Sequence, residues 1–305
     1  MARSRVVLSG LGFREADLAR DDLSRDFEIL DDFLRYAGIR RLKVISRTSV
    51  MRYKGSQKSL PEIAAELKVD AVIEGSVQRV GEQTRVTVQL VSVRDRKPLW
   101  AETFDEHFTN IFLVQDRISE QVARALMLRL SVDERQRLHQ RQTENAEAYQ
   151  NYLKGRFFWN KRTSESMKKG IEYFEQAIRL DPNYALAYAG LADSYNVLSQ
   201  VGELSAHEAM SNAKAAAITA LKIDDTLAEA HASLALVNEV YEWDWTAAER
   251  EFKRAIELNP NFAQAHHWYA MFLSAMGRHD EALAEIRKAK ELDPVSLIAN
   301  TNEGW

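Results

Sequence analysis

The sequence contains no cysteine among its 305 residues. Disulfide bonds, thiolate metal sites and a cysteine nucleophile are therefore excluded, while an oxidising and a reducing compartment are both compatible with the chain. Long hydrophobic runs are absent too: Val86 to Val93 is one of the longest, far below the roughly 20 residues that a membrane-spanning helix needs. Because Arg14, Glu15 and Asp17 interrupt the only apolar start, we expect neither a membrane segment nor export from this start codon.

The composition is that of a folded protein with two domains. Hydrophobic residues make up 46% and charged residues 28% of the chain, close to the average of soluble globular proteins, and the length suits more than one core. Up to Gln142 there are 25 Lys or Arg against 21 Asp or Glu, and beyond it 16 against 24, so the halves carry about +4 and −8. This distribution argues against direct binding of nucleic acid, which requires clustered cations.

The second half repeats one ten-residue pattern. Its three clear copies are Tyr173–Pro182, Glu251–Pro260 and Glu285–Pro294, and the last two prolines are 34 positions apart. A weaker copy at 213–225 has Asp225 where the proline is expected. Residues 146–305 are therefore predicted to form four units.

Within each unit the spacing predicts the second of two helices. A small residue is followed by a large apolar residue, another small residue and a proline, in the sets Gly170, Phe174, Ala177, Pro182; Ala248, Phe252, Ala255, Pro260; and Ala282, Ile286, Ala289, Pro294. The steps of four and three place these side chains on one helical face, where small residues allow a partner helix to approach, and proline ends the helix. The pattern resembles the tetratricopeptide repeat, which implies a helical solenoid that binds peptides or proteins.

The copies also differ from one another. About five extra residues around 160–164 and about nine around 199–206 are expected to lengthen the loops within the first and second units. Ser296 to Trp305 reads as the first helix of a fifth, truncated unit with no polar capping helix behind it. Because terminal repeats normally have a polar outer face, we expect that the chain is a fragment, or that self-association or another subunit covers this end.

The first half has the pattern of a small mixed α/β domain, so the fold class is α+β, with this domain followed by an all-α solenoid. Strands are predicted at 42–46, 71–80, 83–93 and 99–104, the middle two forming a hairpin at Gly81-Glu82. One helix is predicted to open at Ser59–Glu62, with Pro61 in its first turn and Ile63 and Leu67 on its apolar edge. Another is predicted from about 110 to 130, where the buried residues would be Ile111, Val114, Ile118, Val122 and Leu126.

Four short segments of this half resemble the domain related to the amino-terminal domain of TolB and to FlgO. They are Val44–Val50, Tyr53–Gly55, Asp70–Val77 and Leu99–Glu102. The resemblance implies a parent of a bacterial regulatory kind, since this domain accompanies winged-helix regulators, adenylate cyclases and protein kinases. Residues 1–41 match poorly: Val6 to Phe13 would be an edge strand, and Asp21 to Tyr36 the helix after it. The predicted boundaries are 1–130 for the domain, 131–145 for a linker and 146–305 for the repeats.

No catalytic or cofactor motif is found. Gly10-Leu11-Gly12 lacks the further residues of a phosphate loop or a dinucleotide fingerprint, and kinase signatures are absent. His231 and His266 occupy corresponding positions in neighbouring units, and we interpret them as fillers of an aromatic slot in preference to metal ligands. Trp243 and Trp245 are interpreted as turn packing in preference to a ligand cage. The chain is predicted to be no enzyme and to hold no cofactor or metal.

The predicted functional surface is the concave groove along the first helices, which the resemblance implies as the binding site. Carrying positions over from unit to unit assigns six residues to it: Asp193, Asn196, Glu229, Glu239, Gln264 and His267. Receptors of this family for chaperone tails use basic residues there to clamp carboxylates, so this acidic and polar set predicts a neutral or basic peptide partner. An equally favoured alternative is that these are ordinary solvated charges.

The leading hypothesis is thus a non-catalytic interaction scaffold or sensory module of a bacterial signalling or transcription-regulatory system. The alternative is the carboxyl-terminal regulatory part of an adenylate cyclase or a Ser/Thr protein kinase. The chain as written is assigned to the cytoplasm, or to the periplasm if its parent is membrane-anchored.

Overall fold

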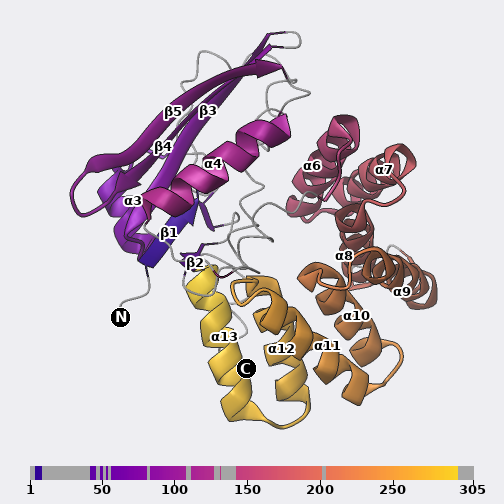
Figure 1. The fold of residues 1–305 in the computed structure, drawn as a ribbon. Coiled ribbons are helices and arrows are strands. Elements are labelled where there is room, and N and C mark those ends of the chain that lie inside the picture. Colours follow the sequence, from indigo (N-terminus) through magenta and orange to yellow (C-terminus); the bar gives the residue numbers. More distant parts are fainter. Residues whose placement is uncertain are drawn as a thin grey trace. The chain divides into compact units, whose positions relative to one another are not determined.

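The computed structural model describes residues 4–8, 42–45, 49–50, 53, 56–80, 83–107, 111–126, 131, 142–200 and 204–294. The chain forms two compact units, whose main boundary lies between Arg141 and Gln142, although residues 290–294 group with the first unit. We call the part before this point the mixed domain and the part after it the helical array (Figure 1). The predicted helix at 21–36, most of the predicted linker and the predicted fifth unit lie outside the described residues.

A five-stranded sheet forms the mixed domain. Its strands are β1 (Ser4–Leu8), β2 (Leu42–Val44), β3 (Ala71–Val80), β4 (Gln83–Ser92) and β5 (Lys97–His107), in the order β2-β1-β3-β4-β5. β1 is parallel to β2 and β3, and the β3-β4-β5 part is antiparallel. The strand predicted at the sheet edge is therefore an interior strand, as its unbroken apolar run Val6–Leu8 favours.

The two faces of β4 differ as the alternating sequence requires. Val86, Val88 and Leu90 are buried. On the opposite face, Arg85 forms an ion pair with Asp105 of β5 at 2.6 Å, and Thr87 contacts Thr103 at 3.3 Å. The sheet thus has an apolar face and a polar, solvated face.

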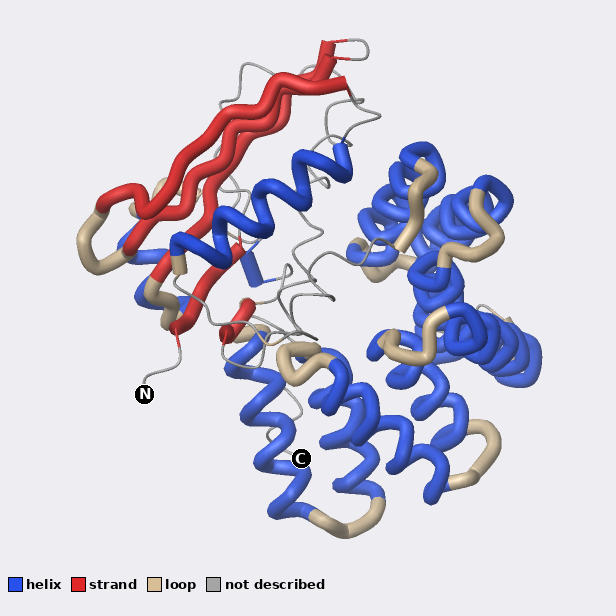
Figure 2. Tube along the Cα trace, in the orientation of Figure 1, coloured by secondary structure: helices blue, strands red, loops and turns tan. Residues whose placement is uncertain are grey.

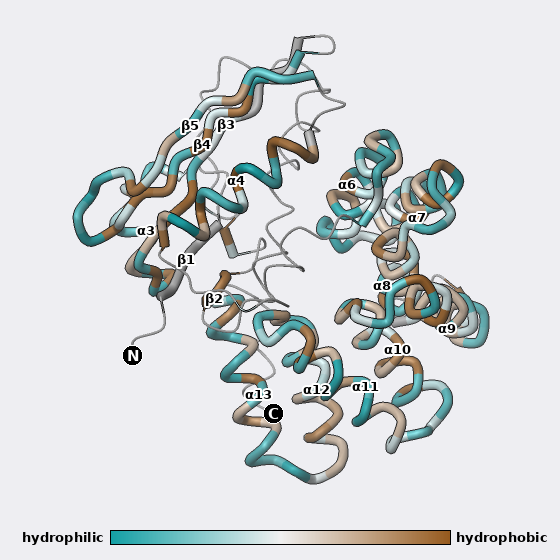
Figure 3. Tube along the Cα trace, in the orientation of Figure 1, coloured by the Kyte–Doolittle hydropathy of each residue, from teal (hydrophilic) through white to brown (hydrophobic). Residues whose placement is uncertain are grey.

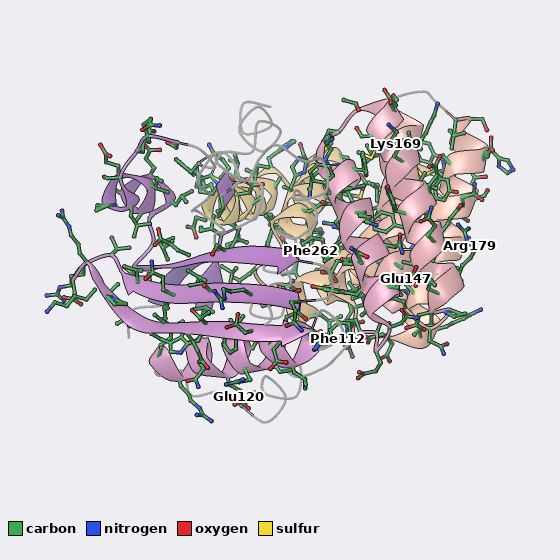
Figure 4. The ribbon with its side chains drawn as sticks, turned by 90° about the horizontal axis from the view of Figure 1, so that it is seen from above. Phe112, Glu120, Glu147, Lys169, Arg179 and Phe262 are labelled. Atoms are coloured by element: carbon green, nitrogen blue, oxygen red, sulfur yellow. The ribbon has the colours of Figure 1, made fainter. Side chains whose placement is uncertain are left out.

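Two helices of the mixed domain lie where they were predicted. α3 (Leu60–Leu67) begins with a capping box, in which Glu62 Oε2 accepts a hydrogen bond from the backbone N–H of Ser59, with an N–O distance of 2.7 Å. α4 (Ile111–Ala125) packs against β4 and β5 and buries Val114, Ile118 and Val122. Figure 3 shows hydrophobic and hydrophilic segments alternating along α4, and Figure 4 shows Glu120 on the side away from the sheet.

Four helix pairs make up the described part of the helical array (Figure 2). Repeat 1 is α6 (Ala146–Asn160) with α7 (Ser164–Leu180), and repeat 2 is α8 (Ala185–Gln200) with α9 (Ala206–Ile223). Repeat 3 is α10 (Ala228–Val240) with α11 (Trp245–Leu258), and repeat 4 is α12 (Ala263–Ala275) with α13 (His279–Leu292). None of the helices in the described ranges is both long and apolar enough to cross a bilayer.

Small residues bring these helices close together around large apolar ones. Phe174 of α7 is fully buried, and a Cβ atom built on Gly155 of α6 or Gly190 of α8 would lie 2.5 or 2.6 Å from its ring. Phe252 is equally buried in α11 and packs against Tyr269 and Phe272 of the next repeat. The second-helix residues of the repeated pattern are therefore the core of the array, as predicted.

The second helices of repeats 1 to 3 end through the same local turn. Asp181, Asp224 and Asn259 are the C-cap residues, and each side chain accepts the backbone N–H two residues later, at 3.0, 2.9 and 3.1 Å. Such an Asx turn competes with continuation of the helix. The turn at Asp224 explains why α9 ends at Ile223, as the repeat requires, although Asp225 stands in place of the proline.

The expected long loops are not found. In repeat 1, α6 has 15 residues and α7 has 17, whereas in repeat 4 α12 has 13 and α13 has 14. The helices of repeat 1 are therefore longer by two and three residues, while three residues separate the two helices in both repeats. In repeat 2 the helices have 16 and 18 residues and five lie between them. The extra residues mainly continue the helices because each added turn keeps its backbone hydrogen bonds.

The contact between Gly190 and Phe174 predicts that a glycine-to-alanine change inside a helix lowers stability, which is the opposite of the usual effect. Alanine is favoured over glycine in a helix by about 1 kcal/mol, but overpacking typically costs about 1 to 3 kcal/mol. We expect Gly190→Ala to destabilise the full chain by about 1 kcal/mol, and to be neutral or stabilising in a Phe174→Leu background, in urea unfolding followed by far-UV circular dichroism. Equal stabilisation in both backgrounds would contradict the close contact.

Candidate functional site

The first helices of the repeats contact one another in order. α6 contacts α8, α8 contacts α10, and α10 contacts α12. We call the surface that these four helices form the first-helix face. The six predicted groove residues lie on its last three helices: Asp193 and Asn196 on α8, Glu229 and Glu239 on α10, and Gln264 and His267 on α12.

Asp193 and Asn196 connect helices and do not lie on the surface. Their side chains are 1% and 0% exposed. The Ser233 hydroxyl of α10 donates to Asp193 Oδ1 at 2.5 Å, and Asn196 Nδ2 donates to the Ser233 carbonyl at 3.2 Å. The two residues therefore tie repeat 2 to repeat 3, whereas the sequence had assigned them to direct partner contact.

Arg156 of α6 is a member of the first-helix face that the sequence reasoning missed. Its Nη1 lies 3.4 Å from Asp193 Oδ2, and its guanidinium lies 4.4 Å from the centre of the Trp159 ring. Arg162 covers the same ring at 3.5 Å. The insertion in repeat 1 obscured the register of α6, so no residue of this helix was carried over. The sequence does indicate the contact between Arg156 and Trp159, because residues three positions apart are neighbours on the surface of a helix.

Burial dominates the protonation of the acids near Arg156. It raises the pKa of Asp193, although Arg156 and the Ser233 hydroxyl stabilise the ionised form. It also raises the pKa of Glu229, where Asp193 and Asp224 add to the effect and Arg156 opposes it. Arg156 thus compensates two of the three predicted groove acids in part.

Glu239 is different, because burial is the sole cause of its shift and raises its pKa to about 7. The residue is partly exposed, but its Oε2 is buried without a hydrogen-bond partner. Asn196 Oδ1 and Gln264 Nε2 are buried and unpartnered as well. Glu239 follows His231 by eight positions, as Asn196 follows Tyr188, so both occupy the same place in their repeats.

His267 adds no positive charge at neutral pH. Burial and the nearby Arg162 lower its pKa to about 4. Within the described part of the chain, no group of three or more His, Asp or Glu side chains is arranged to hold a metal ion.

The two equivalent histidines form a repeated polar clamp. His231 Nδ1 lies 2.6 Å from Glu251 Oε2 and its Nε2 lies 2.9 Å from the Asp225 carbonyl. His266 makes the same pair of contacts, with Glu285 at 2.5 Å and with the Pro260 carbonyl at 3.1 Å. In both clamps the two ring nitrogens lie against oxygen atoms, so the ring bridges a glutamate side chain and a backbone carbonyl. The histidines do fill the expected slot, but they also join the helices of their repeat.

Trp243 and Trp245 do not pack in the turn as predicted. Trp243 is 72% exposed, has a positive φ of 56°, and lies 6.4 Å from the Trp245 ring centre to centre. Trp245 is also exposed, at 46%, so the two rings contact each other at the surface of the turn.

The clamp can be tested by a double-mutant cycle with His231→Phe and Glu251→Gln. Phenylalanine keeps the apolar filling but removes the partner of Glu251 Oε2 and leaves Glu251 with the exposed Arg250 alone, so we expect the two changes to be coupled by about 0.5 to 3 kcal/mol. The hydrogen bond from His231 is also the largest cause that lowers the pKa of Glu251. If the losses in the free energy of unfolding of the two single variants simply add up in the double variant, His231 contributes apolar packing and no polar contact.

Glu239 predicts a pH dependence of stability. Its folded pKa of about 7 lies above the ordinary value of 4.5, so the folded state binds more protons between these values and stability falls as pH rises through this window. The wild type should therefore lose about 1 to 3 kcal/mol more than Glu239→Gln between pH 5 and pH 8. The measurement is the free energy of unfolding of both full-length proteins; identical pH slopes would refute it.

Comparison with known proteins supports the repeats directly. Residues 146–184 and 251–284 each match a family model described as a tetratricopeptide repeat. Among solved structures, the thermophilic TPR protein TTC0263 of Thermus thermophilus has a TM-score of 0.41 and 19% identity, with 65% of this chain and 93% of that one covered. YrrB, a TPR protein with an unusual peptide-binding site, has a TM-score of 0.34 and 26% identity over 53% of this chain and 77% of its own.

Two curated proteins match by sequence. Putative adenylate cyclase 3 of Rhizobium meliloti is 30% identical over 165 residues, 54% of this chain and 28% of the cyclase. Transcriptional regulator HilA of Salmonella paratyphi A is 26% identical over 253 residues, 82% of this chain and 44% of the regulator. The chain thus spans less than half the length of either relative. The helical array contains tetratricopeptide repeats at 146–184 and 251–284.

Proposed function

We propose that the chain is a non-catalytic binding protein of a bacterial signalling or transcription-regulatory system, whose helical array binds a peptide or protein partner along the first-helix face. The observation that carries this proposal is the pair of unpartnered polar atoms on partly exposed residues of two neighbouring first helices. Glu239 Oε2 on α10 and Gln264 Nε2 on α12 are buried in the described structure without hydrogen bonds. Buried polar groups of this kind are costly unless a partner satisfies them.

The same face also offers apolar contact. Met271 of α12 is 49% exposed, and it follows His266 by five positions, as Asp193 follows Tyr188. Met271 therefore belongs to the first-helix face and is available to a partner. A flexible thioether side chain adapts to irregular partner surfaces.

The charges favour a neutral or basic partner. Asp193 is paired with Arg156 and His267 is uncharged at neutral pH, so they add little to the potential that a partner would meet. Glu229 and Glu239 are the predicted groove residues whose ionised forms would meet it directly. A basic peptide would compensate both, whereas a carboxylate tail would be repelled.

The regulatory context rests on the relatives and on the mixed domain. One relative is named as a putative adenylate cyclase and the other as a transcriptional regulator, and segments of the mixed domain resemble the TolB-N/FlgO type. The alternative, a carboxyl-terminal regulatory part of an adenylate cyclase or a Ser/Thr kinase, is favoured by the cyclase match. A cytoplasmic location belongs to the same proposal. The genomic reading frame around this chain distinguishes the two, because a cyclase or kinase domain in that frame would establish the alternative.

The first-helix face can be tested with two matched substitutions in the full chain. Peptides that bind the wild type are selected from a displayed library of random twelve-residue sequences, and affinities are measured by fluorescence anisotropy. We expect Met271→Glu to weaken binding at least about 10-fold, through lost apolar contact and an added buried charge. Leu283→Glu is the control, because Leu283 is a similarly exposed apolar residue on the second helix α13.

Equal affinity of the wild type and the Met271→Glu protein would remove the first-helix face as the binding surface. Equal losses for both variants would indicate a general effect on the array. Circular dichroism of each variant shows whether the helices remain formed.

A further inference from the structure

Most acids of repeats 3 and 4 already have a cationic or hydrogen-bonded partner within the array. Glu249 is held by Lys253 at 2.7 Å and by Arg278 at 2.7 Å, Glu251 by His231, and Glu285 by His266. Outside the predicted groove, Glu242 forms an ion pair with Lys214 at 2.9 Å. The acidic residues of this region are therefore mostly compensated internally.

Glu239 is an exception on the first-helix face. In the described structure its Oε2 accepts no hydrogen bond, and burial is the sole cause of its pKa shift, with no contribution from a neighbouring charge. The residue keeps some solvent exposure, so a side chain from a partner can approach the carboxylate. A buried carboxylate without a cation is destabilising, and a paired one is much less so.

The end of α10 adds a second attraction for a cation at the same place. Glu239 lies in the last turn of this helix, and that turn contains no basic residue. The last carbonyl groups of a helix carry partial negative charge, which favours a nearby Lys or Arg. In α9, by contrast, Lys222 supplies this cation within the chain.

We propose that Glu239 binds a lysine or arginine side chain of the polypeptide that occupies the first-helix face. This inference rests on the proposed function and specifies its partner. Gln264 Nε2, buried and unpartnered on the adjacent α12, is suited to donate to a backbone carbonyl of the same polypeptide. Glu239 thus selects the residue type, while Gln264 contributes to binding whatever the sequence.

A metal ion fits the same position poorly. A divalent cation needs several oxygen ligands, and no cluster of three or more such side chains exists in the described ranges. A single ammonium or guanidinium group needs one carboxylate, which forms a charge-assisted hydrogen bond with it.

The test begins with selection of random twelve-residue peptides on three full-length proteins: the wild type, Glu239→Gln and Glu242→Gln. Glu242 is a suitable control because it is three residues away and already paired with Lys214. We expect the wild type and Glu242→Gln to enrich Lys or Arg at one fixed peptide position, and Glu239→Gln to lose this enrichment while still selecting peptides.

The second step measures the charge contact itself. The best lysine peptide is synthesised with lysine or with acetyl-lysine at the enriched position, and both forms are titrated by fluorescence anisotropy. A hydrogen bond to a charged group corresponds to about 10- to 100-fold in affinity. Acetylation should cause a loss of this size for the wild type and at most about 3-fold for Glu239→Gln.

The outcomes separate the two proposals. Enriched peptides without a Lys or Arg preference, or equal acetylation losses in both proteins, would overturn the role of Glu239 and leave peptide binding intact. A wild type that enriches no peptide would overturn the proposed function, and this inference with it.

Discussion

The packing of Phe174 against Gly155 and Gly190 is the contact on which the geometry of the first repeats depends. A Cβ atom at either glycine would overlap the buried phenylalanine ring, so α6, α7 and α8 approach more closely than larger residues would permit. Alanines have the same role beside Phe252 in repeat 3. Such contacts join repeat 1 to repeat 2 and repeat 3 to repeat 4, and each first helix contacts the next.

Close approach of the first helices also determines the fate of their polar residues. Side chains that point toward the next first helix lose water and then require a partner. Asp193 obtains Arg156 of the preceding first helix and Ser233 of the following one. The exposure at one position of the repeat varies along the array: Asp193 in α8 and Leu236 in α10 are buried, whereas Met271 in α12 is exposed. The face thus changes from internally satisfied to accessible along the array.

The sequence predicted the repeats well because their signals are local. Helix periodicity, small residues at fixed steps and prolines after the second helices place the helix pairs, and both tetratricopeptide matches fall within the predicted array. The apolar run Val6–Leu8 favours an interior position for β1, but it does not identify the neighbouring strands, because strand order depends on pairing between segments far apart in sequence. The insertions were assigned to loops, whereas added turns of helix satisfy their own backbone.

The candidate site was predictable only in part, for a related reason. Repeat alignment identifies which residues share a position, but it does not show which of them are compensated by a neighbouring helix. Arg156 was missed because no residue of α6 was assigned to the groove, and without it the groove was predicted to be acidic and polar. Asp193 and Asn196 were counted as surface although they join α8 to α10.

The formal charge of about −8 beyond Gln142 is therefore a poor guide to what a partner would meet. Ion pairs such as Arg156–Asp193 and Lys214–Glu242 leave this net value unchanged but compensate particular acids within the fold, and burial shifts others toward the neutral form. Selectivity depends on the charges left unpaired, because only these change their solvation when a partner binds. A single uncompensated carboxylate at the end of α10 can consequently distinguish partners more sharply than a face with many paired acids.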